Sequence, residues 1–448
     1  MKLRSLAIAT VATAAVALTS CSPGTTNNEP SDATASTTAE ESSVTTVTFR
    51  LWDEVAAPAY EESFDAFMAQ NEDIKVVVEV VPWADYWERL PLDIQSGDMA
   101  DIFWTNTSNF GKYADNGNLI NISDTLGDDH DEWVQSVTDL YMRDDSLWGV
   151  PQLWDSIALY YNKDLVEAAG IDVNDLTWAA DGGEGDTLLA AATALTTDSE
   201  GRHPGEEGFN ADDRQTYGFN AQADLQAIYL DWLAEAGATF QDEDNNFAFA
   251  STEGETAFQY LVDMINTHYV APSAADTNPN GDVTRDLFLQ GKLGLFQSGP
   301  YNLKTIAENA DFSWGIAPMV AGPEGRVSVV HGVAAVGNAA SKNLEATITV
   351  LKWLGSADGQ AALASQGVSF PGVVDAQDAF VDYWADKGVD VTPFIDAANG
   401  KTQAAPVGPN VNAGLNEVVP VLQDMFLGSI PVAEALQDAQ DAGNAAME

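Results

Sequence analysis

The sequence predicts an α/β fold with two lobes. Segments rich in β-branched and aromatic residues alternate with segments whose apolar residues recur at helical spacing. Strand, helix and strand in this rhythm predict a parallel sheet with helical crossovers. The chain has 448 residues, of which 45% are hydrophobic and 9% aromatic, so it is long and apolar enough to build two or three domain cores.

The first part of the body predicts three strands and a helix. Thr46–Trp52 alternates and is rich in β-branched and aromatic residues, which indicates a strand. Pro58 opens a helix whose apolar stripe ends at Met68. The valine-rich segment Ile74–Val81 predicts a buried second strand, and Asp101–Trp104 predicts a short third one.

The rest of the body continues the alternation. Helical spacing predicts helices over Asp224–Ala236, Thr256–His268 and Leu344–Trp353. Val327–Val336 has the composition of a strand. Thr177–Arg214 is rich in Gly and Asp, which predicts a helix followed by surface loops.

Residues 1–20 predict a signal peptide. Lys2 and Arg4 precede an apolar run that is too short to span a bilayer comfortably. Leu18–Cys21 resembles a bacterial lipobox, in which the chain is cut before the cysteine and the thiol is lipidated. We therefore expect a lipid anchor at Cys21, with palmitate among its acyl chains. The alternative is an ordinary signal peptide with an incidental cysteine.

Residues 21–45 predict the lipidated cysteine followed by a flexible tether. Ser22–Val44 is rich in Ser, Thr, Ala, Pro and Asn and contains no aromatic residue, so it has too little apolar surface to order itself. An anchor, a tether and a globular body together predict a protein held on the extracellular face of the cell membrane.

The charge of the chain excludes several classes of partner. It has 69 acidic and 18 basic residues, a formal net charge of -51. Nucleic acid and anionic lipid surfaces require clustered Lys and Arg, so neither is an expected partner. Cys21 is the only cysteine, which rules out an intramolecular disulfide and a cysteine-based zinc site.

Polar and aromatic residues recur just after the predicted strands, where open α/β sheets bind ligands. A pyranose offers an apolar C–H face that packs on an indole, and hydroxyls that need hydrogen-bond partners. Any single tryptophan is more often a packing residue, but the repeated pairing with a carboxylate or amide favours a sugar site. The residues at these positions are Asp53, Glu54, Trp83, Trp104, Asn106, Trp154 and Asp155.

Several segments resemble one family. Their order along residues 46 to about 440 is similar to that of the family 1 extracellular solute-binding proteins, the carbohydrate receptors of ABC importers. These segments are Ser96–Trp104 (SGDMADIFW), Tyr113–Leu119 (YADNGNL), Gly149–Pro151, Leu159–Leu165 (LYYNKDL), Ala169–Ile171, Thr177-Trp178, Phe288–Gly294 (FLQGKLG) and Ser298–Tyr301 (SGPY).

The resemblance implies the class II periplasmic-binding-protein fold, with a ligand cleft between two lobes that close on binding. It places the chain crossings between lobes near residues 150–155, 312–316 and 355–358. The implied domains are an N-lobe of residues 46–152 plus 315–355, and a C-lobe of residues 153–314 plus 356–448.

The resemblance also implies site residues. Asp53, Glu54 and Asp155 match polar contacts, and Trp83 and Trp104 match cleft positions of the N-lobe. Tyr301 matches an aromatic residue that stacks on sugar, where the family commonly has Trp. Gln222, His331 and Gly332 lie in segments that reach the cleft. For His331 the alternative to a ligand contact is a plain strand residue. No aromatic residue occurs in Ala405–Leu415, which disfavours a long glycan.

The function implied is a monomeric sugar-binding lipoprotein, not an enzyme, that delivers a mono- or oligosaccharide to an ABC transporter permease. The alternatives are a surface carbohydrate-active enzyme and the same fold binding a non-sugar solute. The sequence has no HExxH, Walker A or GxSxG motif, and we expect no cofactor and no metal.

One acidic segment has some features of a calcium-binding loop. Asp242, Asp244, Asn246 and Glu253 mimic an EF-hand loop, but position 6 is Phe247 instead of the glycine that the turn needs. The alternative is a solvated acidic loop.

Overall fold

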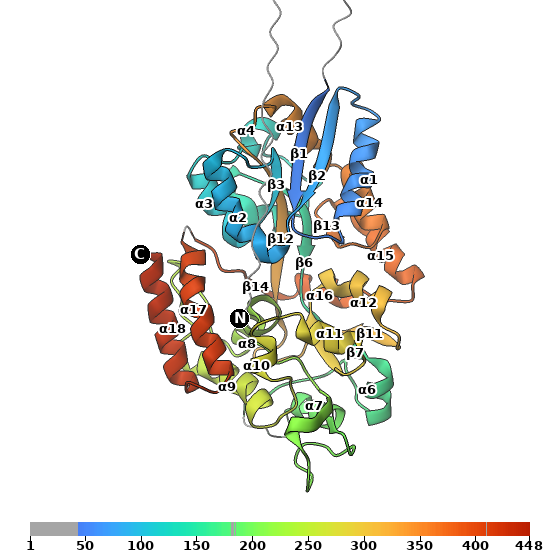
Figure 1. Ribbon diagram of the computed structural model, residues 1–448, viewed down its shortest axis with the longest axis vertical. Coiled ribbons are helices and arrows are strands. Elements are labelled where there is room, and N and C mark those ends of the chain that lie inside the picture. The colour runs from blue at the N-terminus through green and yellow to red at the C-terminus, as the bar shows by residue number, and fades with distance from the viewer. Residues whose placement is uncertain (1–43, 181–182, 184, 409) are drawn as a thin grey trace, which may run out of the picture. The chain divides into compact units, whose positions relative to one another are not determined.

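The computed structural model describes residues 44–180, 183, 185–408 and 410–448, and these form one compact unit (Figure 1). The predicted signal peptide, Cys21 and the predicted tether up to residue 43 lie outside the described residues. The first strand, β1, begins at Thr45, where the predicted tether ends. None of the helices in the described ranges is both long and apolar enough to cross a membrane.

The larger sheet has seven strands in the order β13-β6-β12-β3-β1-β2, with β14 beside β12. β1 pairs in parallel with β2 and β3, as predicted, because a helix crosses between each successive pair. β12 runs antiparallel to β3 and β6, so the prediction of a parallel sheet is wrong for this half. The strands are β1 (Thr45–Leu51), β2 (Ile74–Val80), β3 (Ile102–Asn106), β6 (Val150–Asp155), β12 (Val327–Gly337), β13 (Phe370–Pro371) and β14 (Lys401–Ala404).

A smaller sheet has the order β10-β7-β11 and is antiparallel. Its strands are β7 (Ala158–Asn162), β10 (Leu295–Ser298) and β11 (Trp314–Ala317). Two short hairpins complete the strands, formed by β4 (Met142–Arg143) with β5 (Ser146–Leu147) and by β8 (Thr197–Asp198) with β9 (Arg214–Thr216). We call the parts of the chain built around the larger and the smaller sheet the first and the second lobe.

The helices cover both sheets. They are α1 (Ala57–Met68), α2 (Trp83–Ser96), α3 (Thr107–Asp115), α4 (Ile122–Leu126), α5 (Gln135–Thr138), α6 (Lys163–Ala169), α7 (Thr187–Leu195), α8 (Leu230–Glu235), α9 (Thr252–Asn266), α10 (Ala274–Thr277), α11 (Val283–Leu289), α12 (Leu303–Asn309), α13 (Leu344–Leu354), α14 (Ala357–Ser365), α15 (Gln377–Asp386), α16 (Thr392–Asn399), α17 (Val411–Phe426) and α18 (Val432–Met447). Short 3₁₀ turns span Asp139–Tyr141, Ala211–Asp213, Pro300–Asn302 and Val374–Ala376.

One predicted helix is irregular. The segment predicted as a helix over Asp224–Ala236 begins as a π-helix, η3 (Leu225–Tyr229), and continues as α8. The carboxylate of Asp224 accepts hydrogen bonds from the backbone N–H groups of Gln226 and Ala227, at 3.0 and 2.8 Å, and so caps the first turn. Helical spacing cannot distinguish a π turn from an α turn at this length, and π turns are common near functional sites.

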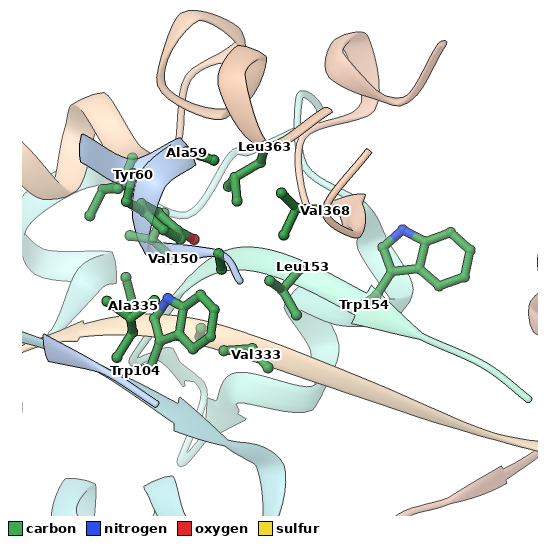
Figure 2. Packing of buried hydrophobic residues seen from close by; sticks show 14 of the residues in the cluster. Ala59, Tyr60, Trp104, Val150, Leu153, Trp154, Val333, Ala335, Leu363 and Val368 are labelled. Atoms are coloured by element: carbon green, nitrogen blue, oxygen red, sulfur yellow. The ribbon is translucent and has the colours of Figure 1, made fainter. Parts of the chain in front are cut away.

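Buried apolar side chains form two clusters, and the first extends from the larger sheet into the smaller one through Tyr160 on β7 and Phe296 on β10. The first contains Trp104, which lies near Tyr60 and the β12 side chains Val333 and Ala335 (Figure 2). The ring centroids of Trp104 and Tyr60 are 5.5 Å apart in an edge-to-face arrangement. The second cluster fills the space among α7, α8, α9 and α17.

The predicted domain boundary after residue 355 is wrong for α14 and α15. Both helices contribute to the first cluster, and α14 packs on α1. The Ser63 hydroxyl of α1 donates to the Gly359 carbonyl at 2.6 Å, and the Gln360 amide donates to the Pro151 carbonyl at 2.7 Å. The chain therefore leaves the first lobe only after α15. The local sequence of these two helices does not indicate which lobe they pack against.

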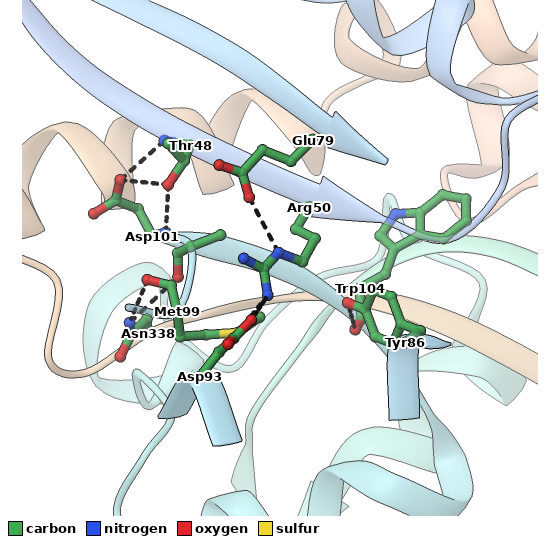
Figure 3. A network of polar contacts seen from close by, with 10 residues as sticks. Thr48, Arg50, Glu79, Tyr86, Asp93, Met99, Asp101, Trp104 and Asn338 are labelled. Atoms are coloured by element: carbon green, nitrogen blue, oxygen red, sulfur yellow. Dashed lines mark hydrogen bonds and ion pairs between the residues drawn. The ribbon is translucent and has the colours of Figure 1, made fainter. Parts of the chain in front are cut away.

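A buried arginine joins β1 to its neighbours in the first lobe. Arg50 on β1 is 7% exposed and donates to Glu79 on β2 at 3.1 Å and to Asp93 on α2 at 2.6 Å (Figure 3). The Thr48 hydroxyl and backbone N–H, two residues earlier on β1, both donate to Asp101 at 2.9 Å. These contacts tie β1 to the elements on both sides of it.

Arg50→Ala is expected to lower the free energy of unfolding by about 1–3 kcal/mol, because it leaves two partly buried carboxylates without their cation. The measurement is urea unfolding. Arg89→Ala, an exposed arginine on α2, is the matched control and should change stability little. Equal stability of both variants would show that the Arg50 contacts contribute nothing.

Candidate functional site

Asp155 and His331 face the same side of the larger sheet. Asp155 is the last residue of β6, and His331 is its direct partner on the antiparallel strand β12. Directly opposed residues project to the same face. The chain crosses into the second lobe immediately afterwards, where the Ile157 N–H donates to the Ser328 hydroxyl at 2.9 Å. The pair therefore lies at the junction between the lobes.

The Asp155 carboxyl group is nearly buried, with 8% exposure. Burial raises its pKa to about 7, although a hydrogen bond from the Ser369 hydroxyl at 3.3 Å acts in the opposite direction, and the charge of Asp53 raises the pKa further. The carboxyl group accepts only this one long hydrogen bond, so its oxygens can accept further hydrogen bonds from a ligand hydroxyl or ammonium group.

His331 is also 8% exposed, and its Nε2 has no hydrogen-bond partner among the described residues. Burial lowers its pKa to about 4, so the imidazole is neutral near pH 7. A buried polar atom without a partner costs free energy, and a bound ligand would supply the missing partner. The sequence alone left His331 open between a strand residue and a contact, and this orphaned nitrogen favours the contact.

Asp53 is fixed at the start of α1. Its Oδ1 accepts from the backbone N–H groups of Val55 at 2.7 Å and Ala56 at 3.3 Å. Burial raises the pKa of this carboxyl group, while those hydrogen bonds and the charge of Lys304 lower it. Glu54, next in sequence, is exposed.

The second lobe contributes Tyr301 and Asp224. Tyr301 follows β10 and is 40% exposed, and its hydroxyl accepts from the Ser298 hydroxyl at 3.3 Å. Burial around this hydroxyl and the charges of Asp224 and Asp155 raise its pKa. Burial also raises the pKa of Asp224.

Asp224 and Lys304 were not predicted as site residues. Asp224 precedes a helical segment, so the sequence marks it only as a capping residue. Lys304 lies on a short helix and has no local motif. The charge of Asp224 affects the pKa of Tyr301, and the charge of Lys304 affects the pKa of Asp53. A sequence pattern does not specify either influence.

Five aromatic rings cluster at the ends of β1, β2 and β3. Trp83, the first residue of α2, is 49% exposed and lies edge-on to Trp52, with ring centroids 5.4 Å apart. Trp87 and Tyr86 pack on the same indole at 5.3 and 5.2 Å. The fifth ring, Trp104, lies 4.9 Å from Trp52 and is 1% exposed.

Trp83 therefore offers a ring face to a ligand, and Trp104 does not. The prediction that Trp104 lines the site is corrected here: its ring belongs to the core and supports Trp52 from within. Trp52 was not predicted as a site residue, although it directly precedes Asp53 in the sequence.

Three other predicted residues serve packing or internal hydrogen bonding. Trp154 alternates to the face opposite Asp155 and stacks on Phe370, with centroids 4.4 Å apart. Gly332 has no room for a side chain, because a Cβ would lie 2.7 Å from Val137 Cγ1. The Gln222 amide is occupied, since its Oε1 accepts from the Thr284 hydroxyl at 2.7 Å. The Trp154 Nε1 atom is buried and has no hydrogen-bond partner among the described residues, but its ring lies on the opposite face of the sheet from Asp155 and His331. Gly332 and Gln222 offer no free side-chain group to a ligand at that pair.

Asn106 lies at a contact between the lobes. Its Oδ1 accepts from Asn109 Nδ2 on α3 at 2.7 Å, and Asn109 Oδ1 accepts from Asn412 Nδ2 on α17. The neighbouring Ser108 hydroxyl donates to the Pro406 carbonyl at 2.9 Å. These bonds join the first lobe to the second beside the end of β3.

The acidic loop around Asp242 satisfies its own hydrogen bonds. Asp242 Oδ1 accepts from the backbone N–H groups of Asp244 at 3.0 Å and Asn246 at 2.9 Å. Within the ranges that the structure covers, no group of three or more His, Cys, Asp or Glu side chains is placed to hold a metal ion. The loop therefore has the geometry of a solvated turn.

Two α/β lobes with carboxylates and exposed rings at their junction define a binding protein of the periplasmic type. Residues 52–361 match the family described as bacterial extracellular solute-binding protein, and the chain belongs to this family. Its members bind solutes and are not enzymes.

Individual relatives agree with this assignment. The crystal structure of M. tuberculosis UspC is 45% identical, covers 90% of this chain and all of its own, and has a TM-score of 0.73. A substrate-binding protein of Listeria monocytogenes, solved with cycloalternan, is 20% identical over 90% of this chain and 99% of its own, with a TM-score of 0.78. A maltooligosaccharide ABC transporter solute-binding lipoprotein of Streptococcus pneumoniae is 23% identical over 96% of this chain and 94% of its own.

Proposed function

We propose that this protein is a sugar receptor that captures a carbohydrate between its lobes and delivers it intact to an ABC transporter permease. The observation that carries the proposal is the buried pair of Asp155 and His331 at the junction of the lobes, where the Asp155 carboxyl group accepts one long hydrogen bond and the His331 Nε2 atom has no partner among the described residues. Trp83 in the first lobe and Tyr301 in the second have exposed rings that a ligand could contact. Relatives that are described as binding maltooligosaccharide or cycloalternan support a carbohydrate ligand.

The chemistry of a sugar matches these groups. The apolar face of a pyranose packs on an aromatic ring, and such contacts contribute about 1 kcal/mol beyond area burial. Its hydroxyls donate to carboxylates and exchange hydrogen bonds with a neutral imidazole. Because Trp83 belongs to the first lobe and Tyr301 to the second, a ring held between them would draw the lobes together.

The proposal is tested by a thermal-shift panel of mono- and oligosaccharides on the mature protein. A ligand that binds only the folded state raises the unfolding midpoint by mass action. We expect at least one carbohydrate to raise the midpoint and to be recovered unchanged. A panel without any shift would contradict the proposal, and recovery of a shortened product would indicate an enzyme.

We also propose that Cys21 carries a lipid that holds the monomeric receptor on the extracellular face of the cell membrane. The Streptococcus pneumoniae relative is described as a lipoprotein, which supports this proposal.

Cys21→Ser is expected to release the protein from membranes into the medium, because the residue that would carry the acyl chains is lost. Immunoblots of membrane and soluble fractions measure the change, and sugar affinity should be unaltered. Membrane attachment that persists in this variant would contradict the lipid anchor.

A further inference from the structure

We infer that Gly299 and Ser298 are positioning residues for Tyr301, which fix its ring and its hydroxyl group before a ligand binds. This inference rests on the proposed function, in which Tyr301 contacts the ligand from the second lobe. It concerns how the protein holds this side chain and applies to any carbohydrate that Tyr301 contacts.

Tyr301 follows the end of β10 that is nearest to the crossing between the lobes. β10 is antiparallel to β7, and its last residue, Ser298, pairs directly with Ala158, the first residue of β7. Because β7 begins shortly after Asp155 on β6, the chain beyond Ser298 continues toward the junction of the lobes. The Tyr301 ring is 40% exposed there.

The Tyr301 ring fills the space that a side chain at position 299 would need. A Cβ atom added to Gly299 would overlap Tyr301 Cε1 and would lie 2.8 Å from Cδ1. The backbone of Gly299 does not itself require glycine, because its φ of -89° and ψ of 173° are ordinary extended values. Glycine is therefore needed at this position for the close approach of the ring.

The backbone under the ring is held by the core of the protein. The Tyr160 hydroxyl on β7 donates to the Gly299 carbonyl at 2.8 Å, and the Asn302 N–H donates to the same oxygen at 3.3 Å. Tyr160 is fully buried, and its ring centroid lies 5.8 Å from that of Phe394. A methyl group added at Gly299 would therefore displace the Tyr301 ring rather than the backbone.

Ser298 sets the direction of the Tyr301 hydroxyl group. Asn302 Nδ2 donates to Ser298 Oγ at 2.9 Å, and an amide nitrogen of this kind can only donate. The single Ser298 hydroxyl proton is directed to the Tyr301 hydroxyl oxygen, 3.3 Å away. Among the described residues no group accepts the proton of Tyr301 itself. That O–H group is therefore available to donate to an oxygen atom of the ligand.

The experiment is a pair of double-mutant cycles, measured by calorimetry with the carbohydrate that gives the largest shift in the thermal panel. Gly299→Ala should weaken binding about tenfold in the wild type, and less than about twofold when Tyr301→Ala is already present. Ser298→Ala should weaken binding about threefold in the wild type, and not in Tyr301→Phe, which lacks the hydroxyl group. A residue with a merely structural role would change affinity equally in both backgrounds.

Gly281→Ala is the matched control and should leave affinity unchanged. Gly281 is an exposed glycine of the second lobe, and its added Cβ would make only an ordinary contact, 3.9 Å from Gln222 Nε2. If Gly299→Ala does not fold, the Ser298 cycle decides the inference.

In either cycle, equal losses of affinity in the two backgrounds, or no loss in the wild type, would overturn the positioning role of that residue while the sugar receptor stands. If no carbohydrate binds the wild-type protein, the proposed function is wrong, and this inference is wrong with it.

Discussion

Trp104→Ala is expected to lower the free energy of unfolding by about 3–5 kcal/mol, the usual cost of removing a large buried ring. Trp104 is 1% exposed and contacts the rings of Trp52 and Tyr60, so its loss opens a cavity under the aromatic cluster. Affinity for the sugar, measured per folded molecule, should fall much less than stability does. Urea unfolding and calorimetry on the same preparation measure the two quantities.

Trp83→Ala is the matched variant and should behave in the opposite way. Its ring is 49% exposed, so we expect stability to change by less than about 1 kcal/mol and sugar affinity to fall about tenfold or more. Trp104→Ala with unchanged stability, or Trp83→Ala with unchanged affinity, would show that the roles of the two indoles have been assigned wrongly.

Asp155→Asn is expected to stabilise the ligand-free protein by about 2–4 kcal/mol near pH 7.5 while weakening sugar binding. The folded-state pKa of about 7 lies above the ordinary aspartate pKa of 3.8, so the folded protein holds this proton more tightly than the unfolded chain does. This group therefore lowers stability progressively as pH rises from about 4 to about 7, and its full cost remains above that range. Asparagine has no charge to bury.

His331 contributes a slope of the opposite sign. Its folded-state pKa of about 4 lies below the ordinary histidine pKa of 6.5, so its contribution to stability rises with pH over that interval. In the wild type the two slopes oppose each other. In Asp155→Asn the Asp155 slope is lost while the slopes of His331 and the other titrating groups remain, so the difference between the two proteins isolates Asp155.

Urea unfolding at about pH 4.5, 6 and 7.5 measures this difference. We expect a gap in stability that is small at the lowest pH and widens toward the highest. Asp378→Asn, at an exposed position, should show no such widening. A gap of constant size, or a destabilised Asp155→Asn at the highest pH, would contradict the buried-charge account of Asp155.

Much of the local structure could be predicted from the sequence. β1, β2 and α1 follow from β-branched alternation and from a helical stripe that opens at a proline. These are short-range patterns. The sequence does not predict the antiparallel direction of β12 or the lobe to which α14 belongs. Both depend on contacts between segments that are far apart in the chain.

The candidate site, too, could be predicted only in part from the sequence. The carboxylates Asp53 and Asp155 were predicted because they directly follow strands. The pairing of His331 with Asp155 depends on the register of β12 against β6, and the two residues are 176 positions apart in the sequence. The influence of Asp224 on Tyr301 depends on the packing of the second lobe. Alternation also could not decide between Trp83, which begins α2 after β2, and Trp104, which lies within β3, because only burial distinguishes them.

The central claim is that the junction of the two lobes binds a carbohydrate and returns it unaltered. Calorimetric titration of the wild-type protein with the best carbohydrate from the panel, followed by chromatography of the recovered ligand, tests it most directly. The account predicts saturable binding of one sugar per chain and full recovery of that sugar. Failure of every carbohydrate to bind, or recovery of a cleaved product, would contradict it.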